Sequence, residues 1–180
     1  MGIVERNLKS YDADTQAMTF FGPILSPAGL VQGSAVLTLT NAQILALPTT
    51  PIAVLPAPGA GKVIQIVRAT VVVDATAGAY TNVDATAGLF LAYGGATNKA
   101  TNAGACTGSI DTAQKSVMLL AGGLVSTAID TTPGALVGVS THYDNVAVDV
   151  AINNAAAGNL TGGNAANTAR ITVDYLIVTL

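Results

Sequence analysis

Apolar and polar residues alternate in several stretches of this chain with the two-residue period of a β-strand. Five stretches are strand-like: residues 62–73 and 89–93, which are rich in strand-forming residues, and residues 35–39, 145–153 and 170–180, in which the alternation is clearest. The stretch 62–73 is rich in β-branched residues, and polar residues interrupt it too often for a buried helix. In the last stretch, the residues expected to point inward are Ile171, Val173, Tyr175 and Ile177. We therefore predict a strand at each of these stretches.

Shorter elements are expected between these strands. Weaker patterns predict strands at residues 117–120, 124–129 and 135–140, and residues 51–55 are expected to form a short extended segment flanked by prolines. Thr40 and Gln43 have the spacing of a capping box, which predicts a short helical turn through Leu47 that ends at Pro48. Residues 94–108 and 155–167 are rich in Gly, Asn, Thr and Ala, and we expect them to form loops.

Many short strands with turn-rich connections and little helix are typical of an antiparallel β-sandwich. We predict an all-β, jelly-roll-like body over residues 35–180 and an extended N-terminal arm over residues 1–34. The arm contains the apolar sequence FFGPILSP, which has neither a helical nor a strand period. It is expected to lie either on its own body or on a neighbouring subunit. The arm residues expected at this interface are Phe20, Phe21, Ile24, Leu25 and Leu30.

Charged residues are unusually few. They make up 9% of the 180 residues, hydrophobic residues make up 51%, and the net charge is −3. The seven basic residues are scattered, so we expect no nucleic-acid partner, because phosphate binding relies on grouped Lys and Arg. Prolines interrupt the uncharged stretch between Asp14 and Lys62, so we expect no membrane span. A weakly charged, apolar surface is typical of a protein that other subunits cover.

The segment PAPGAGK, at residues 56–62, is similar to the end of a nucleotide-binding P-loop. Two required positions differ, because Pro56 replaces the first glycine and Val63 replaces the hydroxyl that would bind magnesium. The residues after Lys62 are strand formers, whereas a phosphate site needs the N-terminus of a helix. We interpret the segment as the entry to a long strand, and we expect no cofactor.

The sequence VDATAG occurs twice, at residues 73–78 and 83–88. We interpret each copy as a turn in which the Asp accepts backbone hydrogen bonds and the Gly takes a positive φ. The alternative is a calcium site formed by Asp74 and Asp84. Calcium usually takes several carboxylates among six to eight oxygens, and neither copy supplies a second acid. We therefore expect no metal site.

Residues suited to catalysis are sparse. The single histidine, His142, lies in the sequence STHYD. A catalytic triad of Ser, His and Asp does not form easily from residues so near each other in the sequence, because its members must converge from separate parts of a fold. Cys106 has no basic neighbour in the sequence, so we expect it to be inert. A sugar-acting enzyme that uses Asp149 or Asp174 is an alternative, but an arrangement of acid, base and cleft is not evident. We expect that the chain is not an enzyme.

Residues 35–94 resemble small structural proteins of bacteriophage virions. The resemblance rests on LTxxQILxLxTTPI at residues 39–52, PxPGxGK at 56–62, the long strand that follows, an Ala79-Tyr80 turn, and the strand at 89–93. Proteins of this type include capsid cement, or decoration, proteins with jelly-roll-like folds. The resemblance implies a homotrimer on the capsid exterior that binds the major capsid protein and ties neighbouring capsomers together. The N-terminus lacks the apolar core of a signal peptide, which fits assembly in the cytoplasm of a bacterial host.

The sequence is therefore consistent with two structural functions. The first is a phage cement protein with a reaching N-terminal arm. The second is a head-fibre or receptor-binding module of a virion, in which the long loops recognise the host surface.

Overall fold

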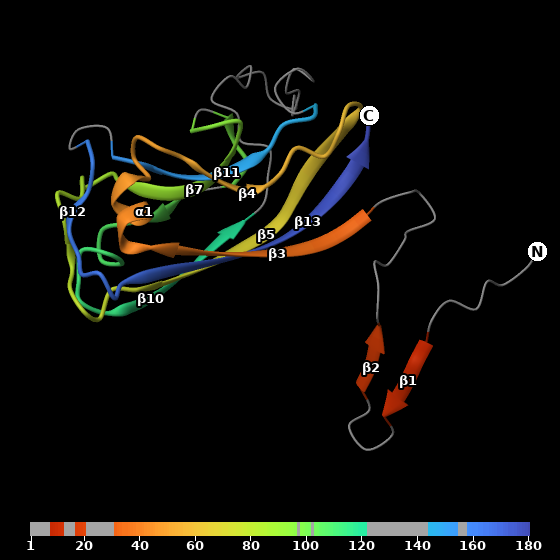
Figure 1. Ribbon diagram of the computed structural model, residues 1–180, viewed down its shortest axis with the longest axis horizontal. Coiled ribbons are helices and arrows are strands. Elements are labelled where there is room, and N and C mark those ends of the chain that lie inside the picture. Colours follow the sequence, from red (N-terminus) through yellow and green to blue (C-terminus); the bar gives the residue numbers. More distant parts are fainter. Residues whose placement is uncertain are drawn as a thin grey trace, which may run out of the picture.

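The computed structural model describes residues 8–12, 17–20, 31–96, 98–101, 103–121, 144–154 and 158–180, with side chains from residue 32 onward except at Asn98. The strands predicted at 124–129 and 135–140 lie outside these residues. The described part is built from antiparallel strands and one short helix, which confirms the prediction of an all-β fold. Figure 1 shows the body as two layers, with β5 and β13 in one and β7 and β11 in the other.

The longer layer is a four-stranded sheet, here called the β13 sheet, with the strand order β10-β5-β13-β3. Its strands are β3 (Val31–Thr40), β5 (Lys62–Asp74), β10 (Lys115–Ala121) and β13 (Thr168–Thr179). Each of them corresponds to one of the predicted stretches, with β13 ending one residue earlier than predicted. β13 is the last of these strands in the sequence, yet it lies inside the sheet and pairs with both β5 and β3.

The second layer, here called the β11 sheet, has the order β4-β11-β7-β8, and β9 also pairs with β7. Its strands are β4 (Ile52–Leu55), β7 (Gly88–Tyr93), β8 (Asn98–Lys99), β9 (Gly104–Ala105) and β11 (Val148–Asn153). Two further short strands, β6 (Tyr80–Thr81) and β12 (Thr161–Gly162), pair with each other. The short strands β8, β9 and β12 fall in segments predicted to be loops, because two residues are too few to show a period.

The predicted arm contains regular structure that the sequence analysis did not predict. β1 (Leu8–Asp12) and β2 (Ala17–Phe20) form an antiparallel hairpin. β3 begins at Val31, so residues 31–34, which the sequence analysis assigned to the arm, belong to the β13 sheet. Gly33 interrupts the apolar pattern there. It pairs with Tyr175, whose ring occupies the space that a Gly33 side chain would take, 2.6 Å from an ideal Cβ to Cζ.

The hydrophobic core lies between the two sheets. The β13 sheet contributes fully buried Val71, Ile171 and Val173, and the β11 sheet contributes Leu91 and Val150. The residues of the β13 sheet alternate with more exposed neighbours, as the period predicts, whereas in β7 both neighbours of Leu91 are buried as well. Of the four residues predicted to point inward from β13, Ile171 and Val173 are buried, whereas Tyr175 and Ile177 are partly exposed toward the end of the strand.

A buried hydroxyl hydrogen bond joins the two sheets through the core. Tyr93 of β7 is 1% exposed, and its hydroxyl donates to the carbonyl oxygen of Ile64 in β5 at 2.5 Å. A buried tyrosine normally needs a partner for its hydroxyl. The ring therefore fills the core while its hydroxyl group fixes the position of one sheet against the other.

A β-bulge in β5 explains its irregular polarity. Asp174 of β13 pairs with Arg68, but the next residue, Tyr175, pairs with Ile66, so Val67 is the extra residue. A bulge shifts the alternation by one position. Arg68 therefore points outward on one side of the bulge, and Gln65 points outward on the other.

The predicted capping box forms at the start of α1 (Asn41–Ala46). The Thr40 hydroxyl oxygen accepts from the backbone N–H of Gln43, and the Gln43 side chain accepts from the backbone N–H of Thr40 at 2.9 Å. Ile44 is the buried residue of this helix. The prediction of a helical turn through Leu47 is confirmed, with Leu47 as the C-cap.

A buried asparagine ties together the loops at one end of the sandwich. The Asn154 side chain, 3% exposed, accepts from the backbone N–H of Asp84 at 2.8 Å. Its amide nitrogen donates to the carbonyl oxygens of Asn82 at 2.9 Å and Gly158 at 2.7 Å. Three loop backbone groups are therefore held by one side chain.

Candidate interaction surface

The P-loop-like segment is occupied by a carboxylate of the same chain. Gly59 and Gly61 have φ values of 100° and 71°, and β5 begins directly afterwards at Lys62. The backbone N–H groups of Gly61 and Lys62 donate to Asp144 Oδ1 at 2.8 and 3.2 Å. The donors that a phosphate would use are thus satisfied internally, and a strand follows where a phosphate site needs a helix. The prediction that this segment is a strand entry is confirmed.

The strand predicted at 145–153 begins later than expected because its first residues serve this turn. Asn145 has a φ of 54°, and its side chain accepts from the backbone N–H of Gly59 at 2.9 Å. Its own backbone N–H donates to the carbonyl oxygen of Lys62 at 2.9 Å. β11 therefore starts at Val148.

Both copies of VDATAG form turns around their aspartate. Asp74 Oδ1 accepts from the Thr76 hydroxyl at 2.6 Å and from its backbone N–H at 3.3 Å, and Asp84 accepts from Thr86 in the same way. The glycine half of the interpretation is wrong, because neither Gly78 nor Gly88 has a positive φ.

The glycine of the second copy is needed for space instead. Gly88 is the first residue of β7, and a Cβ there would lie 2.8 Å from the Cβ of Ala103. As for calcium, the described residues contain no group of three or more metal-ligating side chains.

The two aspartates considered for an enzyme are not brought together. Asp149 lies on β11 and accepts from the backbone N–H of Gly95 at 2.6 Å. Asp174 lies on β13, in the other sheet, beside Arg68. Cys106 is fully buried, and burial raises the pKa of its thiol to about 12.

The remaining candidate residues fall outside the described side chains. His142 and four of the arm residues lie outside the described residues, and only the backbone of Phe20 is described. Those four arm residues are Phe21, Ile24, Leu25 and Leu30. Their proposed contacts stay predictions.

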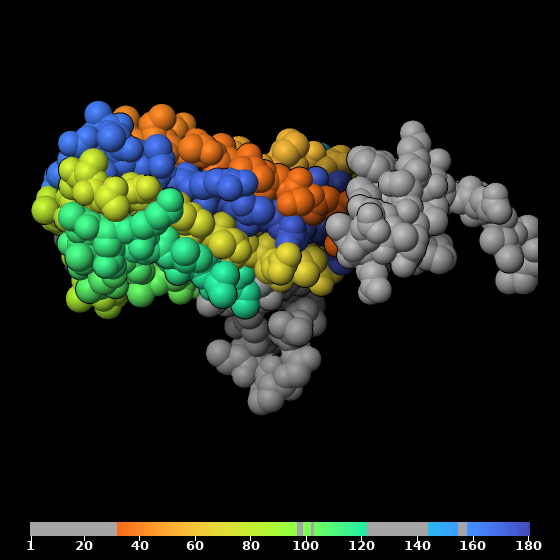
Figure 2. Space-filling view, turned by 90° about the horizontal axis from the view of Figure 1, so that it is seen from below, coloured from red at the N-terminus to blue at the C-terminus, as the bar shows by residue number. Residues whose placement is uncertain are grey.

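The feature that sequence reasoning missed is the outer face of the β13 sheet, the side turned away from the β11 sheet. Figure 2 shows β3 (orange), β13 (blue), β5 (yellow) and β10 (green) side by side on this face. Large apolar side chains are exposed there at both edges: Leu119 and Val117 of β10 are 75% and 62% exposed, and Val36 of β3 is 54% exposed. These exposed apolar side chains make the outer face a candidate interaction surface.

The strand register arranges this outer face in rows that cross all four strands. One row consists of Leu119, Thr70, Thr172 and Val36. The row on one side of it begins with Val117 and includes Arg170, and the row on the other side includes Arg68 and Asp174. The two most exposed apolar edges therefore lie at opposite ends of the same row.

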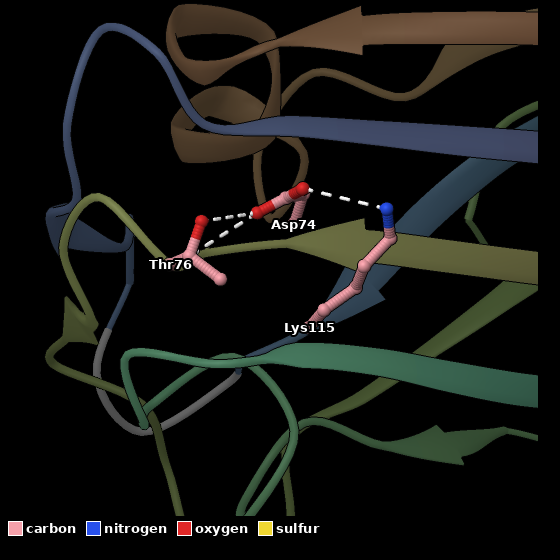
Figure 3. Close-up of polar contacts among 3 residues, drawn as sticks. All are labelled: Asp74, Thr76 and Lys115. Carbon is pink, nitrogen blue, oxygen red and sulfur yellow. Dashed lines mark hydrogen bonds and ion pairs between the residues drawn. The ribbon is translucent and has the colours of Figure 1, made fainter.

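Most charges on the outer face are neutralised within the chain. Lys115 Nζ lies 3.5 Å from Asp74 Oδ2, and Arg68 Nε lies 2.6 Å from Asp174 Oδ2. Figure 3 shows Asp74 between Thr76, which binds one carboxylate oxygen, and Lys115, which approaches the other. Among the described residues, Arg170 is the one charged side chain of this face without an ion-pair partner. A face neutralised in this way loses less solvation energy when a partner covers it.

We expect the stability of the protein to fall in acid through this face. The hydrogen bond from Arg68, followed by one from Ser34, lowers the pKa of Asp174 below its ordinary 3.8. A carboxyl group whose pKa is lower in the folded state than in the unfolded state stabilises the protein at pH values above the unfolded-state pKa. That contribution is lost as the pH falls from about 5 through the folded-state pKa. Because the pair is exposed, it contributes less than about 1 kcal/mol.

Urea unfolding of the wild type and of Asp174→Asn at a series of pH values checks this. The substitution should lower the free energy of unfolding at pH 7 and reduce its decrease below about pH 5. Thr172→Ser, a change on the same strand without a titrating group, is the control. An unchanged pH profile in Asp174→Asn would contradict the assignment.

Within the described residues, no helix is long and apolar enough to cross a membrane. No protein-family model matches the chain, and no curated protein matches it in sequence.

Proposed function

We propose that this chain is a structural protein of a bacteriophage virion, a cement protein that binds the outer surface of the capsid. The observation that carries the proposal is the outer face of the β13 sheet, which exposes apolar side chains and neutralises its own charges. Such a face suits a protein that works by assembling with other subunits. The virion itself comes from the resemblance of residues 35–94 to phage structural proteins.

The strand order also supports a jelly-roll body. Successive strands β3, β4, β5 and β7 alternate between the β13 sheet and the β11 sheet, and so do β10, β11 and β13. A jelly roll is a pair of four-stranded sheets connected in this way. We propose this fold as the rigid part of the cement protein.

In this proposal the arm and the body serve different contacts. The apolar arm residues bind the major capsid protein, and the body stabilises the shell by bridging neighbouring capsomers. Many weak contacts that act together can stabilise a shell strongly. No catalytic residue or cofactor is required.

Deletion of residues 1–30 tests the role of the arm, because β3 begins at Val31 and the body strands stay intact. We expect the truncated protein to keep its circular-dichroism spectrum and Tm but to lose cosedimentation with phage capsids that lack the protein. Deletion of residues 1–7, which spares β1, β2 and the five apolar arm residues, is the matched control.

Equal capsid binding by the truncated and full-length proteins would exclude the arm as the contact. Full-length protein that binds host cells but not capsids would overturn the cement function in favour of a receptor-binding module.

A further inference from the structure

We propose, on the basis of the cement function proposed above, that the outer face of the β13 sheet binds a largely apolar surface of the major capsid protein with a carboxylate at its centre, and that Arg170 pairs with this carboxylate. Arg170 then determines which capsid surface the protein binds. The exposed apolar side chains of the face surround this ion pair.

Arg170 lies in the middle of the outer face. Its strand, β13, has another strand on each side, and the neighbours of Arg170 in the register are Val72 of β5 and Thr38 of β3. Val117 of β10 continues the row beyond Val72. The arginine side chain is exposed, so a partner that covers the four strands also covers Arg170. Arginines at the covered centre of an interface are common among the residues that contribute most of the binding energy.

The carboxylates that the face itself supplies are already engaged. Asp74 lies one row from Arg170 on the neighbouring strand, but its Oδ2 is 3.5 Å from Nζ of Lys115 (Figure 3). Asp174 lies further along β13 and pairs with Arg68 at 2.6 Å. In the part of the chain that the structure describes, no hydrogen bond or ion pair involves the guanidinium of Arg170.

The face therefore carries a positive charge on a chain that is negative overall. Its three described cations are Arg68, Lys115 and Arg170 and its two described carboxylates are Asp74 and Asp174, which leaves +1, whereas the whole chain has −3. Covering a cation with an apolar surface and no opposite charge is strongly unfavourable. The partner has to present a carboxylate there. Phosphates are bound by grouped cations, so one isolated arginine fits a protein carboxylate better than a nucleic acid.

The apolar residues beside Arg170 favour such a pair. Val117 and Leu119 are 62% and 75% exposed, and Val72 lies between Val117 and Arg170 in the row. When a partner covers them, they keep water away from the ion pair, and a charge pair is stronger in a medium of low dielectric constant. A guanidinium group binds a carboxylate through two parallel hydrogen bonds, so the pair also fixes the orientation of the two proteins.

Cosedimentation of Arg170 variants with phage capsids that lack the protein tests this pair. We expect Arg170→Gln to weaken binding by at least about 30-fold, because it leaves the capsid carboxylate covered without a partner. Arg170→Glu should abolish binding, since two carboxylates then meet. Arg170→Lys, which keeps the charge but loses the planar fork, should bind most tightly of the three. All three should keep the wild-type Tm, because the side chain is exposed and has no described partner.

Lys62→Glu is the matched control. It reverses an exposed cation at the start of β5, at a position that follows the inward alternation of Ile64 and Ile66, and it should leave capsid binding unchanged. A carbodiimide should also couple the new amine of the Arg170→Lys variant to an Asp or Glu of the capsid protein. The wild-type guanidinium does not form this cross-link, and mass spectrometry identifies the carboxylate.

The outcomes separate this pair from the cement function. If the wild type binds capsids and Arg170→Glu binds equally well, the pair is overturned and the cement function stands. Equal losses in all three variants would also overturn the pair, because they would show that packing rather than charge matters at this position. A wild type that does not bind capsids would overturn both proposals.

Discussion

Replacing Tyr93 by alanine should lower the free energy of unfolding by about 4 kcal/mol, the range seen when a buried aromatic side chain is removed from a core. The ring is 1% exposed and lies in the cluster that joins the two sheets. Its removal leaves a cavity and leaves the carbonyl oxygen of Ile64 without the hydroxyl donor. Urea unfolding monitored by circular dichroism measures the loss.

Tyr93→Phe separates the two contributions. It keeps the ring in place and removes only the hydroxyl group, so we expect a loss of about 1–2 kcal/mol. If Tyr93→Phe were as destabilising as Tyr93→Ala, the hydrogen bond would outweigh the packing. If neither substitution changed stability, the placement of Tyr93 between the sheets would be wrong.

Replacing Asn154 by alanine should lower the free energy of unfolding by about 3 kcal/mol, because it removes three hydrogen bonds of a buried side chain, each of which contributes about 1 kcal/mol. The Asn154 side chain accepts from the N–H of Asp84 and donates to the carbonyl oxygens of Asn82 and Gly158. Thermal and urea unfolding measure the loss, and hydrogen exchange at the Asp84 amide should become faster.

Asn153→Ala is the matched control, because it changes the same residue type one position earlier at an exposed site. It should change stability by less than about 0.5 kcal/mol. Asn154→Asp should also be destabilising, since a carboxylate keeps the acceptor but has no N–H for the two carbonyl groups. A stable Asn154→Asp variant would show that the two donor bonds contribute little.

The elements that could be predicted from the sequence are those set by local pattern. β13 and β5 are long and β-branched, and the capping box around Thr40 lies within four residues. The aspartate turns at Asp74 and Asp84 are also local, since each carboxylate binds the residue two positions later. In each case the interacting groups are neighbours in the chain.

What could not be predicted depends on distant residues. The contact of Asp144 with Gly61 spans 83 positions, and the ring of Tyr175 explains why Gly33 can lie inside a strand. The strand order follows from pairings of this kind, which leave no mark on a single stretch of sequence.

The candidate surface escaped prediction for a related reason. The sequence of β10, KSVMLLA, contains five apolar residues in succession, so either face of the strand could pack in a core. Its pairing with β5 decides which face is buried: Met118 and Leu120 point inward, and Val117 and Leu119 point outward. Low charge in the composition suggested a covered surface, but only the register locates it.

The inner position of β13 has a consequence for synthesis of the chain. β3 and β5 leave the ribosome long before residues 168–179, yet in the sheet they are joined only through that last strand. Until it emerges, the edges of β3 and β5 are open to wrong partners, and sheets closed by such distant contacts fold slowly. The edges of β3 and β5 that β13 covers therefore stay unpaired while residues 75–167 are synthesised.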